Sequence, residues 1–147
     1  GIVMELFATF VTVPFLSHLA GTPPDLSEFR PTVGNLRLLL LWLVLNWTLA
    51  AFGEELAYRG YLLKRVAGLG QGTRQAWLVS LVVASALFGW GHGGQGLTGM
   101  LQEGFAGLLL GLLYLGCDRN LAVPIVAHGV ANTLAFVLIF FNRYPGV

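Results

Sequence analysis

The chain has 147 residues, of which 56% are hydrophobic and only 10% are charged, and its mean hydropathy is +0.75. A soluble domain has about 25% charged residues, so this composition predicts an integral membrane protein that contacts the lipid bilayer. A net charge of +1 without a basic run argues against a nucleic-acid partner. The single cysteine, Cys117, excludes both an intramolecular disulfide and a cysteine-rich metal site.

The first apolar stretch, residues 2–19, is long enough for one membrane span. Glu5 and His18 lie near its two ends, where we expect both side chains to be solvated. The polar, proline-containing segment 21–35 follows and predicts a loop. Because the chain begins at Gly1 without a methionine or a basic leader, we expect it to be part of a longer protein that has lost an N-terminal portion.

Four more apolar stretches predict four further spans. The expected fold is an all-α, polytopic membrane bundle of about five transmembrane helices around a polar cavity, in a single membrane-embedded domain over residues 1–147. We find no internal repeat and no second domain. The further spans are residues 36–63, which could continue as one helix to residue 65, and then residues 77–90, 99–117 and 121–141.

Two adjacent carboxylates and an arginine follow the apolar run 38–52. A charge at the centre of a bilayer costs at least about 3 kcal/mol, so these groups indicate a functional site. Side chains four apart on a helix share a face, which predicts a supporting ion pair between Glu55 and Arg59. Glu54 points elsewhere without a neutralising partner, and an unpaired carboxylate in an apolar setting becomes a stronger base. Glu54 is therefore the candidate catalytic base.

Three polar side chains on two later spans complete a candidate catalytic set. His92 follows the span at 77–90, while His128 and Asn132 lie four apart on the last span and share a face. A carboxylate, two imidazoles and an amide suit the addition of water to a peptide carbonyl. Glu54 would take the proton from water with help from His92. His128 and Asn132 would donate hydrogen bonds to the oxyanion.

The same side chains also suit a divalent metal. Two histidines and a glutamate form a known catalytic zinc set with water in the fourth position, so Glu54, His92 and His128 could bind Zn²⁺. A metal-free glutamate mechanism fits these residues as well. A purely structural explanation, in which they only hydrogen-bond between helices, is weaker for four such groups on three spans.

The depths of these residues in the membrane do not agree if every span is straight. At about 1.5 Å per residue, Glu54 and His128 lie about 10–15 Å from one face, whereas His92 would lie about 22 Å deep. A strong tilt of the third span, or a break at Gly89 and Gly91, would remove this difference.

Three short patterns within the spans resemble the motifs of one known family. Residues 54–59 read EELAYR and match EExxxR, residues 88–92 match FxxxH, and residues 128–132 match HxxxN. These are, in order, the motifs of the CAAX prenyl protease type II and bacteriocin-processing (CPBP, or abortive-infection) family of intramembrane endopeptidases. The resemblance covers a core of roughly residues 36–141.

This resemblance implies an all-helical membrane fold around a polar cavity in which a peptide bond is hydrolysed. It also implies that Glu54, His92, His128 and Asn132 are the catalytic set. The family is described both as metalloproteases and as glutamate-dependent, so both mechanisms stay open. The compact chain resembles a prokaryotic member of the inner membrane, which predicts a peptide or a membrane-anchored protein as substrate rather than a prenylated CAAX protein.

Two other functions fit parts of the pattern. One is a non-catalytic immunity or partner-binding membrane protein with the same fold. The other is a transporter of protons or small polar solutes, in which Glu54, Glu103 and the histidines would form a relay. Glu103 could line the entrance of the cavity or lie in the membrane interface, and we favour the interface. The three intact motifs favour the protease, and the lack of an inverted repeat argues against transport.

Overall fold

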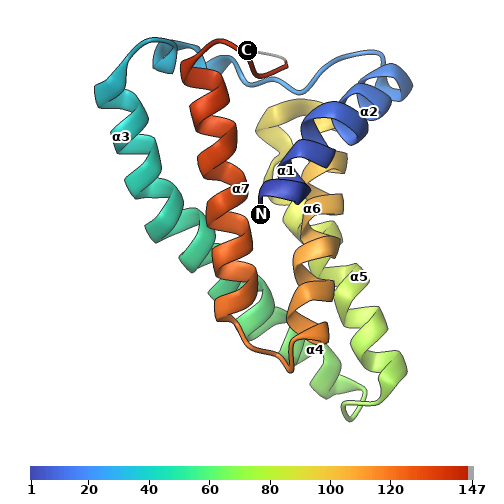
Figure 1. Ribbon diagram of the computed structural model, residues 1–147. Helices are drawn as coiled ribbons and strands as arrows, with labels where there is room; N and C mark the ends of the chain where they lie inside the picture. The colour runs from blue at the N-terminus through green and yellow to red at the C-terminus, as the bar shows by residue number, and fades with distance from the viewer. Residues whose placement is uncertain (146–147) are drawn as a thin grey trace.

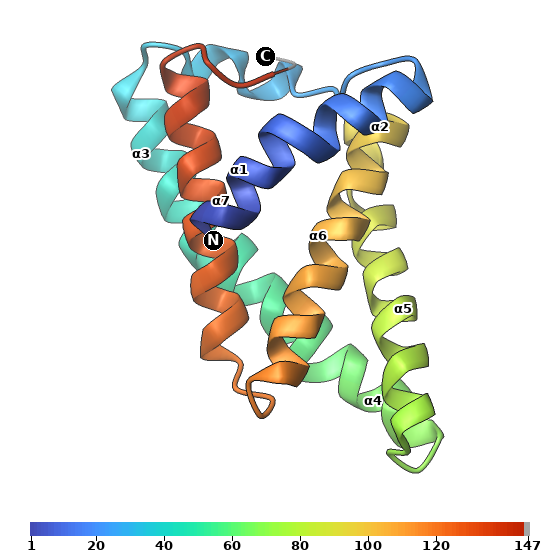
Figure 2. The ribbon, with the colours of Figure 1, turned by 45° about the vertical axis from the view of Figure 1, so that its right-hand side comes forward.

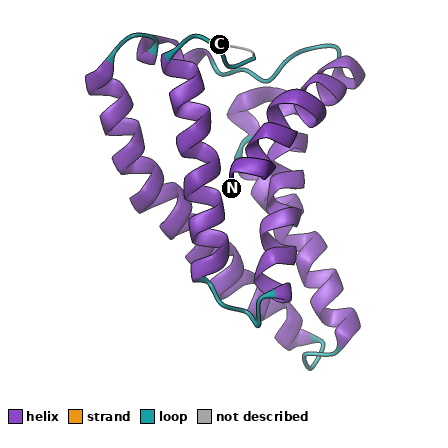
Figure 3. Cartoon of the chain, in the orientation of Figure 1, coloured by secondary structure: helices purple, strands orange, loops and turns teal. Residues whose placement is uncertain are grey.

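All regular structure in the described part of the chain is helical. We describe residues 1–145 of a computed structural model, in which helices are joined by loops and no strand occurs (Figure 3). Four helical stretches are long and apolar enough to cross a membrane. The prediction of an all-α membrane bundle is thus confirmed. The four stretches are Ile2–Ala20, Leu36–Leu69, Gly93–Gly116 and Ala122–Phe140.

The second stretch is one continuous helix that runs obliquely across the molecule from α3 to α4 (Figure 1). Its first turn is capped by the Asn35 side chain, which accepts a hydrogen bond from the Leu38 N–H. The extension of this span as a single helix is confirmed, and it reaches beyond residue 65. Its parts are α3 (Leu36–Leu45), two π-helical segments (Asn46–Glu54 and Leu56–Leu62) and α4 (Leu63–Leu69).

The remaining three helices are α5 (Arg74–Gly91), α6 (Gly96–Gly116) and α7 (Ala122–Phe140). A 3₁₀ turn at Gly93–Gln95 reverses the chain, so that α5 and α6 lie side by side (Figure 2). α5 corresponds to the expected third span but begins with polar residues and is not among the stretches long and apolar enough to cross a membrane. The described residues therefore contain four such stretches rather than the expected five. The Asn120 side chain accepts from the Ala122 N–H and caps α7.

The first stretch crosses the bundle between α7 and α6 (Figure 2). It consists of α1 (Ile2–Phe7), a π-helical segment (Ala8–Thr12) and α2 (Val13–Ala20). It ends at Gly21, whose φ of +76° favours glycine. The loop that follows includes a 3₁₀ helix at Ser27–Thr32 and lies at the same end of the molecule as the α5–α6 turn (Figure 1).

The length of the second stretch accounts for the difference in depth between Glu54 and His92. Neither glycine breaks α5, which stays helical to Gly91. The long helix instead continues to Leu69, so Glu54 lies up to about 22 Å from that end at about 1.5 Å per residue. By the same rise His92 lies about 27 Å from the start of α5.

Glycine allows α5 and α6 to approach closely. A Cβ on Gly89 would collide with the Met100 carbonyl oxygen and lie 2.9 Å from the backbone of Gly104. On α6, a Cβ on Gly107 would press on the Phe88 ring, at 3.2 Å. Glycines on both helices therefore allow the two backbones to pack closely.

Gly89→Ala should lower stability by about 1–3 kcal/mol, because backbone rather than a flexible side chain must move. Gly68→Ala is the matched control, since a Cβ at that helical position meets nothing within 4 Å and should be neutral or stabilising. Thermal unfolding in detergent micelles measures both. Equal melting temperatures for the two variants would contradict the close contact of α5 with α6.

Candidate functional site

A buried ion pair links three helices beneath the candidate site. Arg59 and Glu55 are 1% and 0% exposed, and Arg59 Nη1 donates to Glu55 Oε1 at 2.7 Å. Arg59 Nη2 donates to the Gly107 carbonyl oxygen on α6 at 2.8 Å. The same Glu55 oxygen accepts from His128 Nδ1 on α7 at 2.9 Å. The expected Glu55–Arg59 pair is present, and it holds the long helix to α6 and α7.

Phe88 lies at the centre of this arrangement and is fully buried. The Arg59 guanidinium carbon lies 4.7 Å from the centre of its ring, within the range of a cation–π contact. The His92 and His128 rings lie 4.8 and 6.0 Å from the same ring, measured between centroids. The Phe88 ring therefore contacts both imidazoles and packs between α5 and α7.

Glu54 is arranged differently from its neighbour. Its side chain is 32% exposed, and Oε2 has no hydrogen-bond partner among the described residues. This oxygen faces His128 Nε2 at 4.0 Å, which is too long for a direct hydrogen bond but short enough for one water to contact both atoms. Arg59 is fully engaged elsewhere, so Glu54 is left without a cationic arginine partner, as the helix geometry predicts.

The hydrogen bonds determine which histidine nitrogens carry protons. His92 Nδ1 lies 2.8 Å from the Phe88 carbonyl oxygen, and a carbonyl can only accept, so Nδ1–H donates. His128 Nδ1 donates to the Glu55 carboxylate in the same way. In their neutral forms both rings therefore present Nε2 as an acceptor. Only a positively charged ring could donate a hydrogen bond through Nε2.

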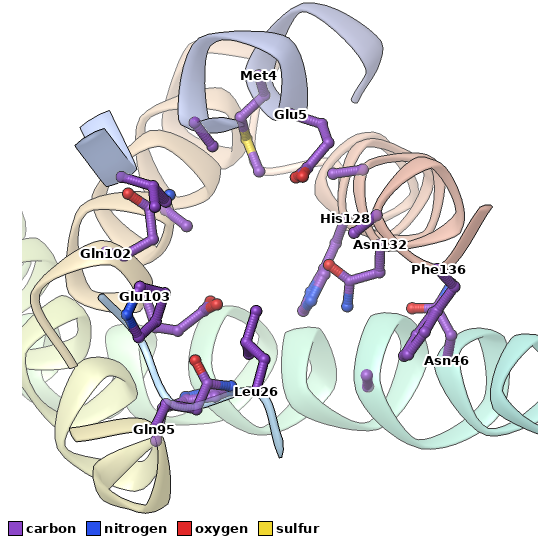
Figure 4. Close-up of a pocket in the computed structure, with 18 of the residues that line it drawn as sticks. Met4, Glu5, Leu26, Asn46, Gln95, Gln102, Glu103, His128, Asn132 and Phe136 are labelled. Carbon is purple, nitrogen blue, oxygen red and sulfur yellow. The ribbon is translucent and has the colours of Figure 1, made fainter. Parts of the chain in front are cut away.

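The candidate residues line one cavity of about 430 Å³. Figure 4 shows His128 and Asn132 on one side of this cavity and Glu103 and Gln95 across from them. The bundle thus brings together the side chains that the sequence singled out on three spans. All four members of the candidate catalytic set line the cavity, namely Glu54, His92, His128 and Asn132. Much of the remaining wall is apolar and includes Leu45, Leu49, Phe105, Leu109 and Phe136.

Two acids lie in this cavity against expectation. Glu5 is buried rather than solvated, and it accepts a hydrogen bond from the Thr9 hydroxyl at 3.1 Å. Burial raises the pKa of Tyr144, so this neutral phenol is a second donor to Glu5. Glu103 also lines the cavity, which is the less favoured of the two positions expected from the sequence. Glu5 is buried because the first stretch crosses the bundle and α1 packs against α7. His18 is exposed, as predicted.

The residues offer metal donors without forming a complete ligand set. Among residues 1–145, no group of three or more histidine, cysteine, aspartate or glutamate side chains is arranged to hold a metal ion. Glu54, His92 and His128 nevertheless line the same cavity. Both rings also bind an acceptor through Nδ1 and leave Nε2 free, which is the usual arrangement of metal-binding histidines.

Two features of the site were not predicted. The bond between Glu55 and His128 joins residues far apart in the sequence, and no local pattern indicates it. Asn46 lines the cavity and is buried. A signal for Asn46 does exist, because Asn46, Ala50 and Glu54 are spaced by four on one helix and therefore share a face.

A comparison with protein-family models places the chain in a known family. The model of the type II CAAX prenyl endopeptidase Rce1-like family matches residues 36–134, which is more than half of the chain. The matched range includes all four candidate catalytic residues. Neither a search of curated proteins nor a search of solved structures gives a match.

Proposed function

The chain belongs to the type II CAAX prenyl endopeptidase Rce1-like family, and from this membership we propose that it is an intramembrane endopeptidase. The observation that carries the proposal is the unpartnered Glu54 Oε2, 4.0 Å from His128 Nε2 in a cavity between apolar spans. A free carboxylate beside an imidazole is what the activation of a water molecule requires. The family resemblance drawn from the sequence is confirmed.

In the proposed reaction Glu54 removes a proton from water as the water oxygen attacks the peptide carbonyl carbon. The carbonyl π electrons move to oxygen and form a tetrahedral oxyanion. The C–N bond then breaks, and Glu54 passes its proton to the leaving amine nitrogen. The free Nε2 atoms of His92 and His128 can accept hydrogen bonds from the water and so orient it.

Asn132 is the donor that we assign to the oxyanion. It lines the cavity, and no hydrogen bond within the described part of the chain occupies its amide group. Its NH₂ can donate whatever the protonation state of the site. His128 can donate only as an imidazolium, because its Nδ1–H is committed to Glu55. Loss of one oxyanion donor typically costs about 3–4 kcal/mol of transition-state stabilisation.

Water must reach a site that lies between apolar helices. A second cavity of about 270 Å³ lies beside the 21–35 loop and is lined by Asp25, Ser27 and Gly94, among others. Three residues line both cavities: Glu28, His92 and Gln95. We therefore propose that water enters from the loop end, past His92.

The substrate class that we propose is a peptide or a membrane-anchored protein. The apolar cavity wall suits apolar side chains, and the polar groups are confined to a few positions. We also propose that the protein lies in the inner membrane of a prokaryote, on the basis of the short connections between α5, α6 and α7.

The proposal is tested by incubating the purified protein in proteoliposomes with a library of internally quenched peptides, soluble and membrane-anchored, that includes unmodified and farnesylated CAAX-type members. We expect cleavage of at least one peptide at one peptide bond, with both fragments identified by mass spectrometry. Failure to cleave or to bind any of the peptides would count against the protease. Chelator treatment of the active protein, followed by added Zn²⁺, then distinguishes the zinc mechanism from the metal-free one, since zinc would supply a Lewis acid beside Glu54.

A further inference from the structure

The amide of Asn46 is buried in the wall of the cavity. Asn46 is only 2% exposed and lies in the π-helical segment that ends at Glu54. Its Nδ2 donates to the Gly129 carbonyl oxygen on α7 at 2.9 Å and to the Thr133 hydroxyl at 3.3 Å. Its Oδ1 has no partner among the described residues.

The orientation of this amide is fixed by its partners. The Gly129 carbonyl can only accept, so the nitrogen and not the oxygen of Asn46 must face it. The Thr133 hydroxyl donates to the same carbonyl at 2.6 Å and accepts from Trp47 Nε1 at 3.2 Å. A flipped amide would place two acceptors together at the carbonyl. Oδ1 is therefore held away from α7.

The free oxygen is itself buried and is turned towards the side of the cavity where Asn132 lies (Figure 4). A buried acceptor without a partner destabilises the fold, typically by about 1–3 kcal/mol. No side chain among the described residues donates to it, whereas a bound peptide would bring N–H groups into the same space. An extended substrate in turn needs acceptors, because each of its N–H groups loses its hydrogen bond to water on entering the cavity.

The cavity beside Asn46 is shaped for close backbone approach. Ala50 lies between Asn46 and Glu54 on one helix face, and Ala131 and Ala135 line the same cavity from α7. These small side chains leave room for a peptide main chain. Asn46 lies no more than about 12 Å from Glu54 along the helix, at about 1.5 Å per residue. An extended peptide covers that distance in about three to four residues.

We propose that Asn46 Oδ1 accepts a hydrogen bond from a backbone N–H of the substrate, three or four residues from the scissile bond. Asn46 is thus a substrate-binding residue that aligns an extended peptide along the long helix, with its carbonyl carbon beside Glu54. The inference rests on the proposed endopeptidase function. In this proposal Nδ2 of Asn46 joins the long helix to α7, and Oδ1 binds the peptide.

Asn46→Ala should lower kcat/KM for the internally quenched peptide that the wild-type protein cleaves by about tenfold, as expected for the loss of one hydrogen bond to a buried group. Thr133→Val is the matched control. It removes the hydroxyl that binds Nδ2, while the Gly129 carbonyl oxygen still accepts from Nδ2 and keeps Oδ1 in place. It should therefore lower the melting temperature without lowering kcat/KM. Asn46→Ser replaces the alanine variant if that variant does not fold.

A second measurement identifies the N–H itself. In a series of peptides, single amides near the scissile bond are replaced by esters, which removes one N–H at a time. With the wild-type protein, the ester at the third or fourth residue on one side should lower kcat/KM about tenfold. With Asn46→Ala the same ester should cause no further loss, because its partner is already absent.

The outcomes separate this inference from the function on which it rests. If Asn46→Ala cleaves as fast as the wild type while Glu54→Gln is inactive, the endopeptidase stands and the role of Asn46 is overturned. Equal losses of activity and stability in Asn46→Ala and Thr133→Val, with no ester effect, would show that the amide only joins two helices. A wild-type protein that neither cleaves nor binds the peptides would refute both proposals.

Discussion

Glu54→Gln should abolish peptide cleavage and leave the folded protein intact. The amide has the size of the carboxylate but cannot accept the proton of the attacking water. General-base catalysis typically contributes about 10²–10⁴-fold to a rate, so we expect at least a hundredfold loss in kcat. The fold should tolerate the change because Oε2 makes no hydrogen bond within the described residues. Cleavage in proteoliposomes and melting temperature in detergent measure the two effects.

Glu103→Gln is the matched control for this variant. Glu103 is an acid that lines the same cavity, so its loss changes the local charge by the same amount without removing the proposed base. We expect it to keep activity within a few-fold of the wild type. If Glu54→Gln still cleaves peptide, or if both variants lose activity alike, Glu54 is not the base. If Glu54→Gln is inactive as expected, membrane peptides that accumulate only in cells expressing it would identify natural substrates.

The spans and the candidate set could be predicted from the sequence because both depend on local patterns. Long apolar runs predict helices that cross a membrane, and residues four apart on a helix share a face. These rules predict that Glu55 pairs with Arg59 and that Glu54 does not, and the contacts agree. Capping is also local, and the contact between Asn120 and the start of α7 follows from one side chain.

The rest depends on how the helices cross, which local patterns do not specify. The bond from Glu55 to His128 exists because the oblique long helix meets α7 at that level. Glu5 looks like an end-of-span residue in the sequence, yet it is buried because α1 lies against α7. The π-helical hydrogen bonding around Glu54 leaves no clear trace in the sequence, since apolar side chains occur on all faces of this span.

Arg59→Ala should destabilise the protein by about 3–5 kcal/mol and lower the yield of folded protein. The substitution leaves the Glu55 carboxylate buried without its cation, and breaking a buried pair in this way costs about that much. It also removes the donor to the Gly107 carbonyl and the cation–π contact with Phe88. Unfolding in detergent micelles measures the loss of stability, and the cleavage assay measures the accompanying loss of activity.

Arg65→Ala is the matched control, because Arg65 is an exposed arginine on the same helix. Its removal should change stability by no more than about 0.5 kcal/mol. A double variant, Arg59→Met with Glu55→Leu, removes both charges, and well-packed apolar residues can replace a buried pair without loss of stability. We expect it to recover stability but not activity, since His128 then lacks the acceptor that holds its ring. If the double variant recovers both stability and activity, Glu55 contributes only to the fold. Equal stability of Arg59→Ala and Arg65→Ala would refute the buried pair.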